Sequence, residues 1–565
     1  MLSPAALQLS PTYYRDNFQQ LANQAQRLYH DLLTQQERHW LAAYQRLPLA
    51  AQCLYVRLLS RKGQWFRRDK LHYDEIDEID TAAQQLQEAG LIDIVTLKEI
   101  AADDSKLHTF NTQPSELLAL FTKAELGQCL SVAGWRTMKR EPLLQLVQQQ
   151  WPENIEKLTH APLFWVCSQD FLELLQLLFF GHLQQSLTDF VLSDLGIYRY
   201  EQYELSTAQR LFQQRQQLEA HWQFERWRQD LPELKSLSAD ALQDLLDSLP
   251  HAVDTTMARR VERIRLQLAR QLERCGEATA ALSYYQQCQR HPARERRLRI
   301  LHQQKDPQRL ELAQQMIEAP WSEEERVFTQ RFVARMKSDP LAKMLEPAAD
   351  ISQQQLLLDE QGNTLWRERG VEFAALQSYV DEHGGSGFYI ENTLFTAVFA
   401  LTFWPVLFAA VPGAFFHPFQ QRAADLYEAD FRSRRQDIVA ECEAVWQAGP
   451  DDWWSQLQQT WQEKNGLANP LLHWPALESC WQELLPLAVQ RIPTAHWRST
   501  FDFLWQDIRR HRSGMPDLIV FPPQGGYRLL EVKGPGDTLQ PNQRAWFAQF
   551  ARHDIPAMVL QVRSS

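Results

Sequence analysis

Residues 514–550 read GMPDLIVFPPQGGYRLLEVKGPGDTLQPNQRAWFAQF. Two short apolar runs, residues 518–521 and 527–532, flank the turn-rich residues 522–526, and this pattern predicts a β-hairpin followed by a helix. If the five-residue loop is symmetric, Phe521 faces Tyr527 across the hairpin. Asp517 then lies opposite Glu531 on the same face of the two strands.

Two carboxylates placed opposite each other repel, unless a cation lies between them or one of them is protonated. Glu531 and Lys533 are two residues apart on the second strand, so both project to this face, whereas Val532 points into the core. Two acids and one lysine therefore converge on a point that suits a divalent metal and the water that attacks a phosphodiester. The alternative interpretation is an ordinary hairpin with an E-x-K pair on its surface.

The ligand types indicate which metal such a site would take. Oxygen ligands without a nearby cysteine favour Mg²⁺ or Mn²⁺ over zinc. Lys533 is then expected to orient the attacking water or to stabilise the charge that grows on the phosphoryl oxygens.

The chain of 565 residues is long enough for three or four domains, and its apolar fraction of 44% is ordinary for globular proteins. Its seven cysteines are scattered and lack zinc-site spacing, which predicts reduced thiols in a cytoplasmic protein. The first residues, MLSPAALQLSPTYYRDNF, lack the pattern of a secretory signal. We therefore expect a compact cytoplasmic protein of several domains.

The formal charge of −12 argues against a surface that is basic throughout, so any DNA site must be a local patch. Residues 255–305 hold twelve Lys and Arg against four Asp and Glu. Arg259, Arg263 and Arg270 can share one face of a helix. This local excess favours a phosphate-facing patch over a merely solvated helical surface.

Residues 1–110 are expected to form an N-terminal helical, winged-helix-like region that binds DNA. It contains the helix LAAQCLYVRLLSRKG, the short extended segment WFRRDKLHY, and a second helix that ends near Gly90. Arg61 and Arg67 give this region a basic edge, although a solvated helix end explains such charges equally well.

Residues 111–155 read as two helices around Gly134, and this pattern resembles a SAP domain, a small helical DNA-binding unit. Lys139 and Arg140 stand where such a unit would meet phosphate. Residues 156–350 contain paired helical patterns that resemble degenerate TPR-like repeats.

Residues 365–565 form the candidate catalytic domain. Within them, residues 394–411 carry no charge and approach the length of a membrane span. Thr396, Thr402 and Pro405 interrupt this stretch, and no cluster of Lys and Arg flanks it. We therefore expect a buried helix and no membrane association.

The hairpin segment resembles the PD-(D/E)XK nuclease superfamily, and in particular its VRR-NUC branch, by the order PD, EVKGPGD, and then Gln543 and Trp546 on the next helix. Three further segments resemble parts of the Fanconi-associated nucleases of bacterial type. They are GFYIENTLFTAVFALTFWPVLF, FHPFQQRAADLYEADFRSRR and LYVRLLSRKGQWFRRDKLHYDEI. The resemblance covers most of the chain. It implies a multidomain, mostly α-helical protein with a C-terminal α/β nuclease domain of the VRR-NUC kind.

The resemblance implies a monomer or weak dimer that cuts 5′ flaps and branched DNA, acts as a 5′-to-3′ exonuclease, and serves interstrand-crosslink repair near the bacterial nucleoid. It also implies roles for individual residues. By this resemblance, Asp517 and Glu531 are the central metal ligands, and a helix-borne Glu391 and the Val532 carbonyl complete the metal site. Lys533 is the catalytic lysine. Asp537 and Gln543 support the metal or the substrate. One departure is that no Cys/His set could build the ubiquitin-binding zinc finger of the eukaryotic relatives.

No base-reading motif is visible, so selection by DNA shape and ends is expected, and a 5′-phosphate is the obvious mark. A terminal monoester carries more charge than a diester, so a rigid arginine cluster can tell the two apart. Arg259, Arg260 and Arg263 form the densest such cluster, and stacked repeats would bring them to face residues 296–302, which include His302. Alternatively, these arginines pair with Glu262, Glu273 and Glu295.

Two rival functions stay open on the sequence alone. One is a non-catalytic helical scaffold that binds DNA and repair proteins through the repeats. The other is a nuclease of restriction type or one that acts on RNA, because no residue visibly reads a 2′-hydroxyl.

Overall fold

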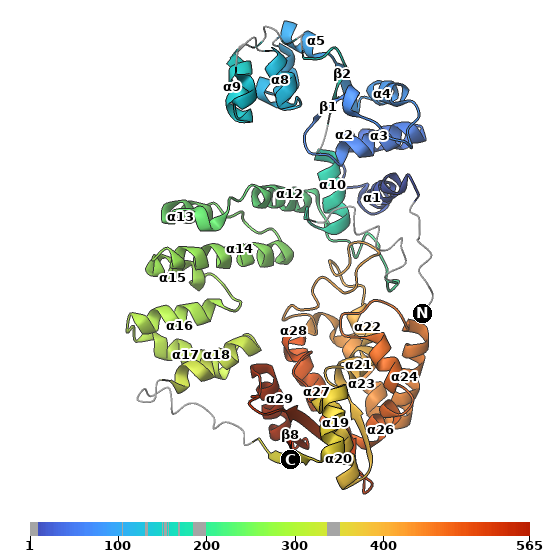
Figure 1. Cartoon of the computed structure of the whole chain (residues 1–565), viewed down its shortest axis with the longest axis vertical. Coiled ribbons are helices and arrows are strands. Elements are labelled where there is room, and N and C mark those ends of the chain that lie inside the picture. Colours follow the sequence, from blue (N-terminus) through green and yellow to red (C-terminus); the bar gives the residue numbers. More distant parts are fainter. Residues whose placement is uncertain are drawn as a thin grey trace. The chain divides into compact units, whose positions relative to one another are not determined.

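The computed structural model describes residues 10–564, apart from residues 104, 130–133, 150, 152–154, 156–157, 168–169, 185–198 and 336–350. The chain forms two compact units, one of residues 1–197 and 210–222 and the other of residues 198–209 and 223–565. Helices dominate both units, and the second contains a five-stranded mixed sheet (Figure 1). The predicted fold class is therefore confirmed.

The first unit contains a helical module closed by a three-stranded antiparallel sheet. Its helices are α1 Tyr13–Tyr29, α2 Gln35–Arg46, α3 Leu49–Leu59 and α4 Ile79–Glu88, and its strands are β1 Trp65–Arg67, β2 Ile92–Val95 and β3 Leu163–Val166. The helix–strand–helix order matches the expectation, but only the start of the extended segment is a strand, because residues 68–70 turn into a 3-10 helix. The central strand is β3, which lies beyond residue 110.

Between β2 and β3 the chain forms a set of short helices, namely α5 Leu97–Ala102, α6 Ser105–Thr109, α7 Pro114–Leu118, α8 Lys123–Cys129 and α9 Arg140–Gln149. The apolar side chains of Leu126 and Leu143 are buried between them. Gly134 has φ of +92°, a left-handed conformation that glycine adopts without strain, and it precedes the 3-10 helix of residues 135–137. The unit also contains α10 Asp170–Phe180, which packs on α1, and the start of α12 Arg215–Gln229.

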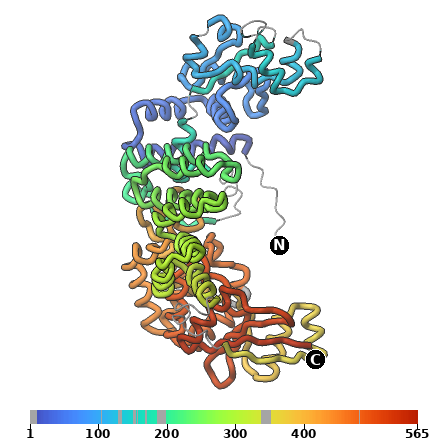
Figure 2. Tube along the Cα trace, turned by 90° about the vertical axis from the view of Figure 1, so that its left-hand side faces the viewer, coloured from blue at the N-terminus to red at the C-terminus, as the bar shows by residue number. Residues whose placement is uncertain are grey.

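The second unit begins with a stack of helices in which each packs on the next (Figure 2). These are α13 Ala239–Asp247, α14 Thr255–Arg274, α15 Ala278–Gln286, α16 Ala293–Gln303, α17 Gln308–Glu318 and α18 Glu323–Ala334. Side-chain oxygens of Ser238, Asp254 and Ser322 accept backbone hydrogen bonds and so fix the starts of α13, α14 and α18. These helices lie in the part of the chain for which TPR-like repeats are predicted.

The five-stranded sheet has the order β4-β8-β7-β6-β5. Its strands are β4 Gln353–Leu358, β5 Ser386–Tyr389, β6 Leu518–Phe521, β7 Arg528–Lys533 and β8 Ala557–Ser564. Strands β5, β6 and β7 pair antiparallel, whereas β8 pairs parallel with both β7 and β4. The sheet therefore starts at residue 353, ahead of the predicted boundary at residue 365.

The register of the β6–β7 hairpin is the predicted one. Leu518 pairs with Leu530 and Val520 with Arg528, so the loop is symmetric. Side chains alternate between two cores: Leu518, Leu530 and Val532 pack toward α19 Glu360–Arg369 and α20 Val371–His383, while Ile519 and Leu529 pack toward the other face. Asp517 and Glu531 belong to this second face.

The second face is covered by α29 Pro541–Arg552 and by a helical insertion between β5 and β6. The insertion contains α21 Leu394–Thr402, α22 Trp404–Leu407, α23 Gln436–Ala448, α24 Pro450–Lys464, α25 Trp474–Cys480, α26 Leu484–Arg491, α27 Thr494–Gln506 and α28 Ile508–His511. Residues 394–408 are nearly all buried, as expected, but the expectation of one helix was wrong. The first helix stops at Thr402, and Pro405 sits in the first turn of the next helix, where its missing N–H is tolerated. Among the described residues, no helix is both long and apolar enough to cross a membrane.

Candidate active site

Asp517 ties the start of β6 to both neighbouring strands. Its Oδ2 accepts a hydrogen bond of 2.8 Å from the backbone N–H of Val532 in β7. Its backbone carbonyl accepts from the N–H groups of Ile390 (2.8 Å) and Glu391 (3.1 Å), which follow β5. Three separate segments of the chain are thereby joined at one residue, through its side chain and its backbone carbonyl.

Glu531 is fully buried, and its two carboxylate oxygens have different surroundings. Oε1 lies 2.8 Å from Nζ of Lys533 and also accepts a hydrogen bond from Nε2 of Gln543. Oε2 is buried and has no hydrogen-bond partner among the described residues. A buried carboxylate oxygen without a donor is costly, so this atom calls for a proton or a cation.

The electrostatics of this pair are those of two acids that share one site. Burial raises the pKa of Asp517, and it also raises the pKa of Glu531. The negative charge of Asp517 raises the pKa of Glu531 further, while Lys533 opposes this effect. A divalent cation would relieve both the burial and the repulsion.

Glu391 lies in the loop between β5 and α21, and its environment corrects one expectation. Because α21 begins at Leu394, Glu391 precedes the helix and is not helix-borne. Its Oε2 accepts a hydrogen bond from the hydroxyl of Tyr389, and its Oε1 lies 3.4 Å from Nδ2 of Asn392. Its charge contributes to the raised pKa of both Asp517 and Glu531, so it acts on the same site.

Within the part of the chain that the structure describes, no group of three or more His, Cys, Asp or Glu side chains is arranged to hold a metal ion. The contacts above explain this. Glu391 is held by Tyr389, one oxygen of Asp517 is used by the Val532 N–H, and the ammonium of Lys533 supplies the positive charge beside Glu531. The donor set and the partnerless Oε2 of Glu531 nevertheless fit a hard divalent cation, provided that Glu391 turns away from Tyr389.

The two expected supporting residues have different environments. Gln543, in the first turn of α29, accepts the N–H of Gln540 at 2.8 Å through its Oε1 and donates to Glu531 through its Nε2. It therefore fixes Glu531 relative to the helix. Asp537 is exposed, and its Oδ2 accepts from the N–H of Gly534 at 3.2 Å, so it closes the turn after β7.

Sequence reasoning missed two residues of this site. Glu372, in the first turn of α20, adds to the raised pKa of Asp517, for which burial is the main cause. Tyr389 is 40% exposed, and its ring stacks on Phe373 at 5.6 Å between centroids. The position of Tyr389 two residues before Glu391 was a usable signal, whereas nothing in the local sequence links Glu372 to Asp517.

Comparison with known proteins connects this geometry to a family. Residues 12–93 match the FAN1 HTH domain, and residues 451–564 match the VRR-NUC domain. The chain is 34% identical, over 98% of its length and 96% of the relative's, to the Fanconi-associated nuclease 1 homolog of Pseudomonas aeruginosa. The chain belongs to the Fanconi-associated nuclease family.

Further relatives of the family are similar over most of this chain. The Fanconi-associated nuclease 1 homolog of Oryza sativa is 26% identical over 96% of the chain and 61% of the relative. A crystal structure of paFAN1 bound to DNA with a 2-nucleotide 5′ flap and a gap is similar with a TM-score of 0.73, at 32% identity and 99% coverage of both chains. The VRR-NUC match starts at residue 451, so helix α20 with Glu372 and the loop with Glu391 precede it.

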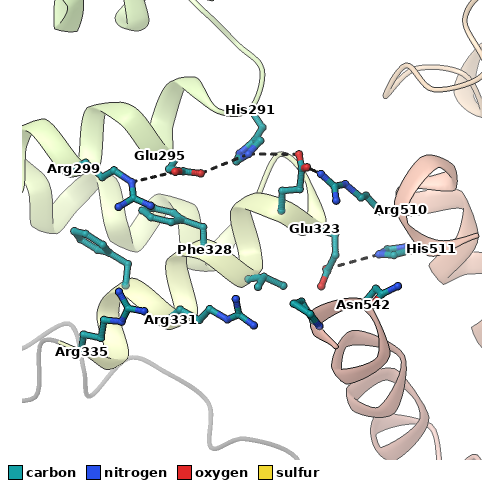
Figure 3. Close-up of a pocket in the computed structure, with 14 residues that line it drawn as sticks. His291, Glu295, Arg299, Glu323, Phe328, Arg331, Arg335, Arg510, His511 and Asn542 are labelled. Carbon is teal, nitrogen blue, oxygen red and sulfur yellow. Dashed lines mark hydrogen bonds and ion pairs between the residues drawn. The ribbon is translucent and has the colours of Figure 1, made fainter. Parts of the chain in front are cut away.

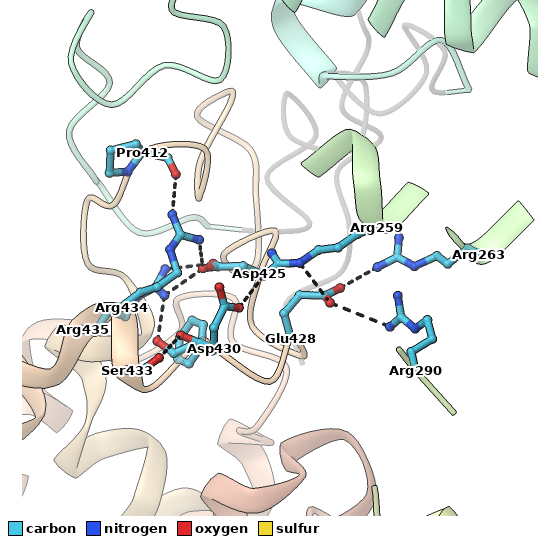
Figure 4. Close-up of polar contacts among 11 residues, drawn as sticks. Arg259, Arg263, Arg290, Pro412, Asp425, Glu428, Asp430, Ser433, Arg434 and Arg435 are labelled. Atoms are coloured by element: carbon cyan, nitrogen blue, oxygen red, sulfur yellow. Dashed lines mark hydrogen bonds and ion pairs between the residues drawn. The ribbon is translucent and has the colours of Figure 1, made fainter. Parts of the chain in front are cut away.

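In this member of the Fanconi-associated nuclease family, two of the predicted phosphate-binding arginines meet a loop of the catalytic domain (Figure 4). Arg263 lies 2.6 Å from Glu428, and Arg259 lies 2.5 Å from Asp430 and 3.5 Å from Glu428. Arg290 lies 3.8 Å from the same Glu428. These arginines line a cavity of about 750 Å³ together with Arg509 and Arg510.

The other members of the predicted cluster lie elsewhere. Arg260 is largely buried and pairs with Glu225 at 3.4 Å, and burial lowers its pKa. His302 packs edge-on against Phe332 at 5.3 Å between centroids. The expected alternative partners also differ, because Glu428 and Asp430, rather than Glu262, Glu273 or Glu295, bind Arg259 and Arg263. Consecutive residues of a helix point in different directions, which is why the cluster splits.

A second cavity, of about 440 Å³, lies between the repeats and the end of the catalytic domain (Figure 3). His291 lies 3.6 Å from Glu295 and 3.5 Å from Glu324, while His511 lies 3.9 Å from Glu323. Arg331 and Arg335 of the α18 end are exposed at its rim. The cavity is therefore lined by charges of both signs.

In the first unit, the predicted DNA contacts divide into structural and exposed cations. Arg67 is buried and pairs with Asp69 at 2.6 Å and Glu125 at 2.8 Å, so its charge is used internally. Arg140 donates to the backbone carbonyl of Ala119 at 2.9 Å. Arg140 is nevertheless exposed, as are Lys139 and Arg61, and Arg61 lies over the ring of Tyr73.

Proposed function

We propose that this chain is a metal-dependent, structure-specific DNA nuclease that cuts 5′ flaps, degrades DNA from 5′ to 3′, and acts in interstrand-crosslink repair. The observation that carries the proposal is the carboxylate of Glu531. It is buried beside Asp517, one of its oxygens is held by Lys533 and Gln543, and the other has no donor among the described residues. Membership of the Fanconi-associated nuclease family, in which a solved relative holds 5′-flap DNA, supports DNA as the substrate.

The residues of the candidate active site have different roles, because their side chains differ in charge and in hydrogen-bonding groups. Asp517, Glu531 and Glu391, with the carbonyl of Val532, would hold Mg²⁺ or Mn²⁺, which supplies an activated water and neutralises phosphate charge when bound. Lys533 carries its ammonium group at the same place and stabilises the charge that develops on the phosphoryl oxygens. Gln543 orients Glu531, and Asp537 keeps the turn after β7 closed.

Asp517→Ala and Glu531→Ala test this assignment. Each substitution removes a metal ligand and leaves the arginine clusters intact, so cleavage should be abolished while DNA affinity is kept. The assay uses labelled flap, nicked, single-stranded and RNA substrates with Mn²⁺, and Glu318→Ala on the exposed side of α17 is the control. Cleavage at a near-normal rate in either variant overturns the assignment and leaves the scaffold function.

We further infer that the 750 Å³ cavity binds the terminal 5′-phosphate of the flap. Three guanidinium groups meet at one point there, those of Arg259 and Arg263 from α14 and that of Arg290 from the turn before α16. A guanidinium group can bind two phosphate oxygens at once through two parallel N–H donors. The wild type should therefore cut a flap with a 5′-phosphate faster than one with a 5′-hydroxyl. The double variant Arg259→Gln, Arg263→Gln should lose this preference, whereas Arg296→Gln, whose arginine pairs with Glu273, should keep it. Equal rates on both ends in the wild type overturn the inference.

A further inference from the structure

Glu428 is the shared partner of three guanidinium groups (Figure 4). Its carboxylate lies 2.6 Å from Arg263, 3.5 Å from Arg259 and 3.8 Å from Arg290, and its side chain is only 13% exposed. It lines the same cavity as these arginines. One carboxylate therefore stands at the point on which three cations converge.

The backbone that presents Glu428 is held in place by a separate cluster of charges. Arg434 and Arg435 bind Asp425 at 2.5 and 2.9 Å, and the backbone N–H of Glu428 donates to the Asp425 carbonyl at 2.9 Å. Phe431 in turn donates its N–H to the Glu428 carbonyl at 3.1 Å. Because the turn is fixed, Glu428 can leave the arginines by a rotation of its side chain alone.

The arginines need an anion at this place. Burial lowers the pKa of Arg263, and the positive charges of Arg290 and Arg509 add to this effect, while Glu428 opposes them. Like charges gathered in a partly buried cavity repel strongly unless an anion compensates them. Without DNA, Glu428 supplies that compensation from within the chain.

We propose that Glu428 occupies the place of the terminal phosphate and, by competing for the arginines, sets the discrimination between a 5′-phosphate end and other DNA groups. The inference rests on the proposed function of this cavity. A carboxylate carries one negative charge, as does an internal phosphodiester, whereas a terminal monoester carries between one and a half and two at neutral pH. A 5′-hydroxyl carries none.

The exchange of ligands explains the direction of the discrimination. A monoester that displaces Glu428 brings more negative charge to the three arginines than it removes. A diester only replaces one charge by an equal one, and a hydroxyl leaves Arg263 and Arg290 without the charge of Glu428, while Arg259 keeps its ion pair with Asp430. Displacing Glu428 costs the same free energy for every DNA end, so a monoester is seated on the arginines in most bound complexes and a diester or a hydroxyl end in few.

Glu428→Gln tests the proposal, because glutamine keeps the size of the side chain and removes its charge. For the flap with a 5′-hydroxyl, the cleavage rate at saturating enzyme should rise about tenfold, because without the charge of Glu428 a phosphodiester near the flap end is seated on the arginines in many more of the bound complexes. For the flap with a 5′-phosphate, which is already seated in most bound complexes, this rate should change by less than about threefold. The ratio of the two values is the decisive measurement.

Glu273→Gln is the matched control, because Glu273 also pairs with a repeat arginine, Arg296, but does not line the cavity. Its ratio should equal that of the wild type. Glu428→Ala, which also removes the charge, is the second test if the glutamine variant does not fold. A folded variant with the wild-type ratio, or the failure of both variants to fold, shows that Glu428 is a structural clamp and overturns the proposal. A wild type that shows no preference for the 5′-phosphate instead defeats the proposed function of the cavity.

Discussion

Lys533 and Gln543 both bind Oε1 of Glu531, so two donors from β7 and α29 hold a single oxygen. This division leaves Oε2 for another ligand. The lysine therefore has a role that differs from that of the acids: it carries charge to the site without being a metal ligand.

Lys533→Ala should abolish cleavage and keep the binding of Mn²⁺. The substitution removes a cation that acts on the phosphoryl group, whereas Asp517 and Glu531 stay in place. Calorimetric titration with Mn²⁺ measures the second property, and Asp517→Ala, which should lose Mn²⁺ binding, is the comparison. Loss of Mn²⁺ binding in Lys533→Ala would contradict the separate role of the lysine.

Tyr389→Phe should strengthen the apparent affinity for Mn²⁺ by up to about tenfold, because the hydrogen bond from the Tyr389 hydroxyl must break before Glu391 can turn toward the metal. The phenylalanine ring keeps the stack on Phe373, so packing is preserved. The Mn²⁺ concentration that gives half-maximal cleavage reports this change, with Phe388→Leu on the same strand as a packing control. An unchanged or higher half-maximal concentration would show that the Tyr389 hydroxyl does not compete with the metal for Glu391.

At the scale of single elements, the sequence was most informative where structure is local. The five-residue loop of residues 522–526 set the register of β6 and β7, and so the opposition of Asp517 and Glu531 was predictable. Helix α4 and the positive φ of Gly90 just after it were predictable for the same reason.

Pairings between distant segments were beyond local patterns. Strand β3 completes a sheet with β1 and β2 across the whole SAP-like region, and β4 joins a sheet whose other strands follow far along the chain. Likewise, no spacing in the sequence relates Arg263 to Glu428 or Asp517 to Glu372, because tertiary packing alone brings them together. The residues of the candidate site were thus easier to predict than the distant residues that their side chains contact.

Helix α14 carries Arg259 and Arg263, and its start depends on one side chain. Oδ1 of Asp254 accepts a hydrogen bond of 2.8 Å from the N–H of Met257. Asp254→Ala should lower the free energy of unfolding by about 1 kcal/mol, whereas Asp254→Asn, which can still cap the helix, should change it little. Urea unfolding of the variants measures this, and equal loss in both variants would show that charge rather than capping matters.

At the scale of the whole molecule, a net charge of −12 coexists with local clusters of arginine and lysine. DNA binding must then depend on a few cations, and each phosphate contact contributes to the dependence of affinity on salt. The exposed Lys139 is one such candidate.

Lys139→Ala should therefore weaken DNA binding equally for all sequences and reduce the slope of log affinity against log salt by about 1. Fluorescence anisotropy at several salt concentrations measures the slope, and Lys98→Ala on the exposed side of α5 is the control. A loss of affinity without a change of slope would place Lys139 outside the phosphate contacts.

The order of strands in the catalytic sheet also governs when the protein can fold during its synthesis. Strand β8, which is synthesised after the other four strands of this sheet, lies between β4 and β7 and is paired parallel with both. A nascent chain that stops before residue 557 therefore keeps β4 and β7 apart and leaves an open edge on β7. Premature termination of translation thus yields a product that cannot complete the sheet on which Glu531 and Lys533 stand.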